Sequence, residues 1–286
     1  MSTFEILCVT MNQNDFSKVI DMNIHSDVVF ANQADRTELT ELSFEGHKAR
    51  MITTQTRGVG VNRNLALLHA QGDICLLADD DVEYYDDMEE RILSEFAAHP
   101  DGDIIIFHLD STDPVRIFQK APKTKRLRFW NRAPSSAVRI AFRLSAVKKG
   151  NIWFTTLFGG GCTFPSGEDS MWLNTARKKG LRMYVSTQTI GKVSYETSTW
   201  FTGYDRKFFY GKGAYHQAVH PHTTWLWKQY ILFRFRKFGT MASKERIEWF
   251  SHGAKGYRKL LSYDEYVECL ENRAKCTHSG EKTADD

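Results

Sequence analysis

The chain has 286 residues, and its shares of hydrophobic (42%) and charged (26%) residues are those of a folded globular protein, which excludes a disordered or collagen-like chain. The net charge of +3 hides an asymmetry: residues 1–113 carry a balance of −15 and residues 114–286 one of +18, so the basic half implies an anionic partner. No run approaches the ~20 apolar residues that span a bilayer, and the first residues do not have the pattern of a secretory signal. The five cysteines form no C-x-x-C pair, which argues against a disulfide framework or a zinc ribbon. We therefore expect a cytoplasmic protein.

Apolar runs and helical patterns alternate over the first part of the chain. The runs predict buried strands at residues 4–10, 26–31, 49–54, 73–78 and 103–109. Helices are expected in the stretch that ends near residue 24, at residues 61–71 and at residues 88–99. Strands alternating with helices predict a mostly parallel sheet with helices on both faces. This part of the chain therefore indicates a Rossmann-type nucleotide-binding half.

The chain changes character after Pro114. Residues 115–150 hold eleven Lys and Arg residues and no acid. A glycine turn at residues 159–161 precedes a helix that begins near Glu168 and ends at Gly180, and a strand is expected at residues 181–186. The last hundred residues are aromatic and basic, and we expect a frayed tail from about residue 277.

Three adjacent aspartates, Asp79, Asp80 and Asp81, follow the apolar run at residues 73–78. Ligands of open α/β sheets bind beyond the carboxyl ends of the strands, and three neighbouring carboxylates repel one another unless a cation offsets their charge. Hard oxygen ligands of this kind suit Mg²⁺ or Mn²⁺, which can bridge a diphosphate. The alternative is a solvated loop whose aspartates cap the helix at residues 88–99.

A second acidic pair, Glu168 and Asp169, opens a predicted helix. Acids at this position cap helices and interact favourably with the helix dipole. A carboxylate held near a hydroxyl can also act as a general base, and the residues alone leave both interpretations open.

Arginines flank the glycines of the segment Thr56–Asn64. Arg57 and Arg63 could contact phosphate through their paired N–H groups, although the segment matches neither G-x-G-x-x-G nor the Walker pattern. Surface arginines at a helix start are the alternative.

The order of these features resembles the family-2 glycosyltransferases, which have a GT-A fold. The resemblance begins with the first strand and its Thr10 and continues with Asp35 after the second strand. Next come the G-x-x-x-x-R-N segment at residues 58–64 and the run GDICLLADDD, which is similar to the strand that carries the family's DXD motif. Last comes the Glu-Asp pair, whose Asp169 lies 88 residues after Asp81. The resemblance covers residues 3–200 and is strongest to bacterial enzymes of capsule, exopolysaccharide or lipopolysaccharide synthesis.

The resemblance implies an inverting transfer of sugar from a nucleotide-sugar donor, preferably a UDP-sugar, to a glycan or a polyprenyl-linked glycan. By position, the resemblance implies nucleotide-sugar binding by Thr10, Asp35 and Arg63, with Asp79 and Asp80 near the ribose and diphosphate. It implies metal binding by Asp81 with Asp79, and catalysis by Asp169 as base, with Glu168 beside it touching the acceptor. Arg57 joins the nucleotide-sugar candidates through its possible phosphate contact. Mn²⁺ or Mg²⁺ would be the cofactor.

Two segments depart from the family pattern. The loop after the second strand reads Asn-Gln-Ala-Asp-Arg at residues 32–36 in place of a D-x-S/G-S-x-D type loop. Where many relatives carry a metal-binding His, the chain has Tyr195. His216, His220 and His222 are the remaining candidates for a third metal ligand, but isolated histidines are more often surface or packing residues.

The aromatic-basic segment Trp225–Phe238 is too short to cross a bilayer, and its apolar residues fall all around a helical wheel. One hypothesis is a buried helix packed on the GT-A sheet. The other is an interfacial anchor whose cations face anionic lipid at the inner surface of the plasma membrane.

We therefore predict an α/β protein with a GT-A fold, in which a Rossmann-like sheet is flanked by helices and followed by a helical, basic-aromatic extension. The expected parts are a donor half at residues 1–113, an acceptor half at 114–205, the extension at 206–276 and the tail at 277–286.

Two alternative functions are a sugar-phosphate nucleotidyltransferase and a non-enzymatic RNA-binding protein. The chain lacks the Gly- and Lys-rich loop that usually follows the first strand of a nucleotidyltransferase, which counts against the first alternative. No nucleic-acid partner is expected, because no known binding motif is present and the acidic half would repel phosphate.

Overall fold

The computed structural model describes residues 2–112, 120–128, 134, 136–193, 203–238 and 241–279. The chain divides into two compact units. The first comprises residues 1–156 and 168–198, and the second comprises residues 157–167 and 199–286.

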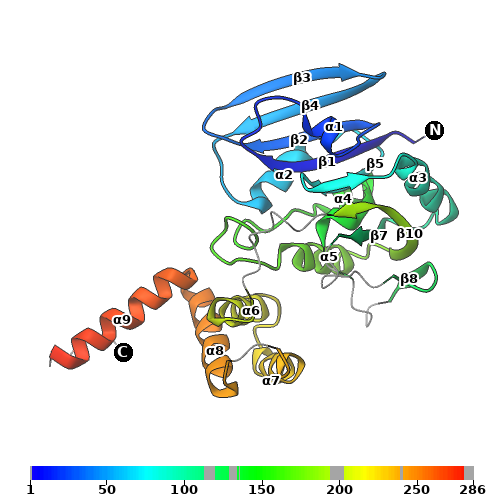
Figure 1. Cartoon of the computed structure of the whole chain (residues 1–286). Coiled ribbons are helices and arrows are strands. Elements are labelled where there is room, and N and C mark those ends of the chain that lie inside the picture. The colour runs from blue at the N-terminus through cyan, green and yellow to red at the C-terminus, as the bar shows by residue number, and fades with distance from the viewer. Residues whose placement is uncertain are drawn as a thin grey trace. The chain divides into compact units, whose positions relative to one another are not determined.

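The first unit is built on a ten-stranded sheet in the order β3-β4-β2-β1-β5-β9-β7-β10-β6, with β8 paired to β10 (Figure 1). The strands are β1 (Phe4–Met11), β2 (Asp27–Gln33), β3 (Glu38–Phe44), β4 (His47–Thr54), β5 (Ile74–Asp79), β6 (Val82–Tyr84), β7 (Ile104–Ser111), β8 (Lys125–Leu127), β9 (Ile140–Arg143) and β10 (Met183–Val193). Strands β4, β2, β1 and β5 pair in parallel, as do β7 and β10. Strand β9 lies antiparallel between β5 and β7, so β7 and β10 run in the same direction as the first four.

Helices cover both faces of this sheet. They are α1 (Lys18–Asp21), α2 (Val59–His69), α3 (Met88–Ala98), α4 (Leu144–Gly150) and α5 (Glu168–Lys178), with one 3₁₀ turn at Ala137–Arg139. Side chains alternate along a strand, and in β1 residues Ile6 and Cys8 enter one apolar core while Leu7 and Val9 enter the other. A sheet buried on both faces is what near-continuous apolar strands predict, and the expected α/β fold class is confirmed.

The hairpin β3–β4 was not fully anticipated, since only its second strand carries an apolar run. Strand β3 lies at the edge of the sheet and is mostly exposed on both faces, so no burial pattern marks it in the sequence. Its turn places Glu45 and Gly46 at positive φ, 48° and 86°, as tight hairpin turns require. The first helix is also shorter than expected, because α1 ends at Asp21.

The second unit is helical and consists of α6 (Arg206–Val219), α7 (Thr224–Phe235), α8 (Ser243–Lys259) and α9 (Tyr263–Ser279) together with the loop of residues 157–167. Helices α6 and α8 cross closely at two glycines: a Cβ on Gly213 would meet the carbonyl of Phe250, and one on Gly253 would meet that of Tyr210. The expected helical extension begins where α6 begins, and α9 continues to Ser279. None of the described helices has the length and apolar character needed to cross a membrane.

Candidate active site

Polar side chains meet at the carboxyl ends of the parallel strands of the first unit. Strand β1 delivers Thr10, β5 delivers Asp79, and the turn after β5 carries Asp80 and Asp81. The hydroxyl of Thr10 donates to the carboxylate of Asp80. The structure therefore brings together Thr10 and the three aspartates, which the sequence singled out separately.

Helix α2 is fixed to this edge by residues that sequence reasoning did not assign. The Asn62 side chain donates to the carbonyl oxygens of Thr10 (3.2 Å) and Ala31 (2.7 Å). The Asn64 side chain bonds the backbone of Phe154 in both directions, at 2.9 and 2.8 Å. A Cβ on Gly60 would collide with the carbonyl of Thr155, so the close approach of residues 154–155 requires glycine there. The G-x-x-x-x-R-N segment was the available signal for these contacts.

Arg63 lies between two asparagines that hold α2 and binds three carboxylates at once. Its Nη1 is 2.6 Å from Asp169 Oδ1 and 3.2 Å from Glu168 Oε1, and its Nη2 is 3.0 Å from Asp79 Oδ1. Only 5% of its side chain is exposed. Burial lowers the pKa of Arg63, but the three carboxylates outweigh this and raise it overall, so the guanidinium stays charged.

The carboxylate of Asp169 is oriented from two sides. Oδ1 accepts from Arg63, and Oδ2 accepts from the backbone N–H of Ala137 at 2.9 Å. Burial raises the pKa of Asp169 to about 7, with smaller increases from Glu168 and Asp79 and decreases from Arg63 and the Ala137 N–H. A carboxyl with a pKa near neutrality and with 19% of its side chain exposed has the properties of a general base.

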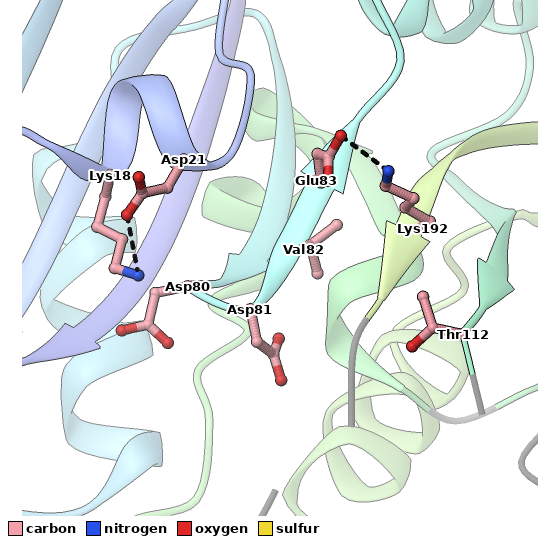
Figure 2. Close-up of a pocket in the computed structure, with 8 residues that line it drawn as sticks. All are labelled: Lys18, Asp21, Asp80, Asp81, Val82, Glu83, Thr112 and Lys192. Carbon is pink, nitrogen blue, oxygen red and sulfur yellow. Dashed lines mark ion pairs between the residues drawn. The ribbon is translucent and has the colours of Figure 1, made fainter. Parts of the chain in front are cut away.

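Asp80 and Asp81 line a cavity of about 350 Å³. Figure 2 shows both carboxylates just before Val82 and Glu83, with Thr112 across from Asp81 and two ion pairs among the lining residues. These pairs join Lys18 to Asp21 at 3.4 Å and Lys192 to Glu83 at 3.0 Å. Burial, followed by the charges of Asp79 and Asp80, raises the pKa of Asp81 to about 6. The cavity thus concentrates negative charge at Asp81.

The donor set allows a divalent cation but does not by itself form a complete cage. No group of three or more His, Cys, Asp or Glu side chains within the described residues is arranged to hold a metal ion. Mg²⁺ commonly uses one or two carboxylates and completes its shell with water and substrate phosphate. Asp79 and Asp80 already accept bonds from Arg63 and Thr10, so Asp81 fits as the principal ligand.

The remaining nucleotide candidates, Asp35 and Arg57, lie on the surface. Arg57 Nη2 is 2.6 Å from Asp35 Oδ1, and the two side chains are 50% and 94% exposed. They pair with one another, and no contact joins them to the aspartates after β5 in the described part of the chain. Tyr195 falls outside the described residues.

The histidine candidates for a third metal ligand all belong to the second unit. The ring of His216 is buried and stacks on the Trp227 ring with 4.8 Å between centroids, and the ring of His220 stacks on the same Trp227 ring at 4.6 Å. His222 is exposed. The packing of His216 and His220 supports the structural interpretation of these two rings.

Comparison with known proteins agrees with the motif order. Residues 26–155 match the family model described as glycosyl transferase family 2. No curated protein matches the sequence.

Solved structures show the same architecture. The chain is similar to crystal structures of S. aureus TarS 1–349, alone (TM-score 0.56, 13% identity), with UDP-GlcNAc (0.58, 13%) and with UDP (0.58, 14%). Each match covers 91% of this chain and 93% of the other. At this identity the likeness establishes the fold. The match to glycosyl transferase family 2 spans residues 26–155, and the chain has the GT-A fold that the order of its motifs predicted.

Proposed function

We propose that this protein is a metal-dependent, inverting glycosyltransferase that moves a sugar from a nucleotide sugar to a glycan or a lipid-linked glycan in bacterial surface polysaccharide synthesis. The observation that carries the proposal is the Asp169 carboxylate, which is fixed by Arg63 and the Ala137 N–H in a unit that contains the family-2 region. A UDP-sugar is the preferred donor, because a solved structure of similar fold, TarS, is a complex with UDP-GlcNAc.

The residues at the sheet edge divide into donor and metal roles. Thr10, Asp79 and Asp80 would contact the ribose and diphosphate, and the exposed pair of Asp35 and Arg57 would contact the nucleoside. Asp81, helped by Asp79, would hold Mn²⁺ or Mg²⁺, which supplies positive charge to offset the charge that develops on the leaving diphosphate.

The transfer is a single displacement at the anomeric carbon. Asp169 takes the proton of the acceptor hydroxyl, and the freed electron pair of the acceptor oxygen forms the new bond to the anomeric carbon. The bond from that carbon to the diphosphate oxygen breaks with its electrons staying on the nucleoside diphosphate. Because the acceptor attacks opposite the leaving group, the configuration inverts. Glu168 lies beside Asp169 and would contact the acceptor.

The exposed face of α7 supports a peripheral position on an anionic membrane. Ile231 is buried and Arg246 of α8 donates to the carbonyl oxygens of Phe235 (2.6 Å) and Phe238 (2.9 Å), which fixes the orientation of the helix within its unit. Trp225 and Phe233 are each 64% exposed.

Cations lie among these exposed rings, and α7 carries no acid. Arg236 lies 4.4 Å from the centroid of Phe233, and Arg234 and Lys237 are exposed. Aromatic rings with flanking cations suit the headgroup region of an anionic bilayer. We therefore place the enzyme at the cytoplasmic face of the membrane, where a polyprenyl-linked acceptor would be found.

A panel of nucleotide sugars tests this function. The purified chain is mixed with UDP-, GDP- and dTDP-sugars, with Mn²⁺, Mg²⁺ or EDTA, and both nucleoside-diphosphate release and the melting temperature are followed. We expect a UDP-sugar to stabilise the protein in the presence of metal and to be consumed, whereas Asp169→Asn keeps the stabilisation without turnover. If RNA stabilises the protein and no nucleotide sugar does, the proposal is wrong.

A further inference from the structure

Arg63 has contacts that differ from those expected of a nucleotide ligand. Its two terminal nitrogens are occupied by Asp79, Glu168 and Asp169, which come from two elements, β5 and α5. A diphosphate would have to displace one of these carboxylates from an almost fully buried guanidinium. We propose that Arg63 is a positioning residue that holds the Asp169 carboxylate in its base orientation and joins it to Asp79 of the donor side, and that it is not a phosphate ligand.

The surroundings of Arg63 fix its position without any ligand. Its guanidinium lies 5.5 Å from the centroid of the Phe154 ring, and that ring stacks on Trp172 of α5 at 5.3 Å with an interplanar angle of 12°. Asn62 and Asn64, the residues on either side, tie α2 to the strand ends and to Phe154. The arginine is therefore held by its neighbours in a place where it meets the carboxylates.

The geometry of the guanidinium explains why arginine is needed there. Its planar fork offers separate nitrogens to groups on opposite sides, whereas a lysine ammonium is a single point charge. Nη1 serves the two residues that open α5, and Nη2 serves the aspartate at the end of β5. One side chain thus connects the proposed base to the donor aspartates.

Arg63 also sets the charge environment of Asp169. Among the described residues, the groups that act most on the pKa of Asp169 are Glu168 on its own helix, Asp79 from β5, Arg63 from α2 and the Ala137 N–H. Arg63 is the one cation among these four. Removing its charge leaves three carboxylates close together, so Asp169 should lose its proton only at higher pH.

Two substitutions at position 63 and one control test this role, which rests on the proposed function. Arg63→Met removes the charge, and Arg63→Lys keeps the charge but loses the fork. Arg50→Met is the matched control, because Arg50 forms a largely buried ion pair with Glu5 at 2.5 Å. Glu5 lies near the start of β1, at the other end of that strand from Thr10. The measurements are UDP affinity, kcat and KM for donor turnover from pH 5.5 to 9, and melting temperature.

We expect Arg63→Met to lower kcat by about a hundredfold and to change UDP affinity by less than about threefold, a difference below the effect of one lost charged hydrogen bond. Its pH–rate profile should move to higher pH by about one pH unit or more. Arg63→Lys should keep the profile near that of the wild type with an intermediate kcat. Arg50→Met should lower the melting temperature and leave the profile in place.

The opposite results overturn the proposal. If Arg63→Met weakens UDP binding by about tenfold or more and leaves the pH–rate profile in place, Arg63 is a phosphate ligand. If the loss of kcat in Arg63→Met is explained by the unfolded fraction of the protein, the role of Arg63 is structural only. Carboxyl NMR of Asp169, assigned with Asp169→Asn, separates this proposal from the proposed function, because it needs no turnover. If the wild type consumes no donor, the function fails, whereas an Asp169 titration that Arg63→Met leaves unmoved defeats the role of Arg63.

Discussion

The acidic strand ends of the first unit and the basic face of α7 in the second unit are both charged, but their charges are held in different ways. Asp169 and Glu168 share a buried guanidinium, and Asp81 carries a raised pKa through burial. Arg234 of α7 and the cations that follow this helix, Arg236 and Lys237, are exposed to solvent. Charge in the acidic region is therefore weakly screened, and charge on α7 is strongly screened.

This difference determines how much a single residue contributes. A buried charge that loses its partner affects its neighbours by several kcal/mol, so one substitution in the acidic region should be decisive. An exposed cation contributes about 1 kcal/mol near an anionic surface, so α7 acts through the sum of several residues. Substitutions in the two regions test this contrast.

Asp169→Asn should have the largest effect. The amide keeps the shape of the side chain but cannot take a proton, so we expect donor transfer to fall by about a thousandfold. UDP affinity and the fold should be retained. Isothermal titration with UDP and a turnover assay check both points, and turnover within about tenfold of the wild type would remove Asp169 from the role of base.

Asp81→Asn should separate metal binding from folding. At pH 8 and without metal, the variant should melt higher by about 2–4 °C, the shift expected from about 1 kcal/mol, because burial and the charges of Asp79 and Asp80 disfavour the ionised carboxylate. With Mn²⁺ and UDP the wild type should gain stability and the variant should not.

Asp21→Asn is the control for this experiment, because Asp21 lines the same cavity but is exposed and paired with Lys18. It should respond to Mn²⁺ and UDP as the wild type does. A full response by Asp81→Asn would show that the metal, if needed, is held elsewhere.

The carboxylates of this region could be predicted from the sequence, but their connection could not. Asp79 to Asp81 follow a buried run and Glu168 opens a helix, and both are local signals. The partners of Arg63 are 16, 105 and 106 residues away, so their contact depends on the packing of α2, β5 and α5. The same holds for Asn62 and Asn64, whose partners are backbone groups of distant segments.

Helix α7 shows a second limit of sequence reasoning. Its apolar residues lie on the buried side, as Ile231 does, and also on the exposed side, as Trp225 and Phe233 do. A hydrophobic pattern identifies a core face only when the other face is polar, so the wheel left two hypotheses open. The fold class was predictable because β1, β2 and β5 are buried on both faces and read as continuous apolar runs.

The pH dependence of turnover should show the weak screening of the acidic region. Asp169 must be ionised to accept a proton, and burial raises its pKa to about 7, so kcat should rise with pH and level off above pH 7. At pH 5.5 it should be about thirtyfold below the plateau. Glu168→Gln removes a charge that raises the pKa of Asp169 and should move the profile to lower pH. A flat profile from pH 5 to 8 would mean an ordinary carboxylate or another base.

The smallest effects are expected at the C-terminal end of α7 and the residues just after it, where three substitutions are combined to be measurable. Reversal of Arg234, Arg236 and Lys237 to Glu should weaken binding to phosphatidylglycerol vesicles by about tenfold or more and leave donor turnover in solution unchanged. The matched control reverses Lys244, Lys255 and Lys259, exposed residues of α8, and alters the net charge equally.

Vesicle flotation at low and high salt distinguishes a membrane face from a general charge effect. Wild-type binding should fall as salt rises, because exposed charges are screened, and Phe233→Ser should weaken it at any salt through lost apolar burial. If the α8 control loses binding as much as the α7 variant, net charge explains the attachment and α7 holds no special face. Equal binding to neutral vesicles would likewise exclude recognition of anionic lipid by these cations.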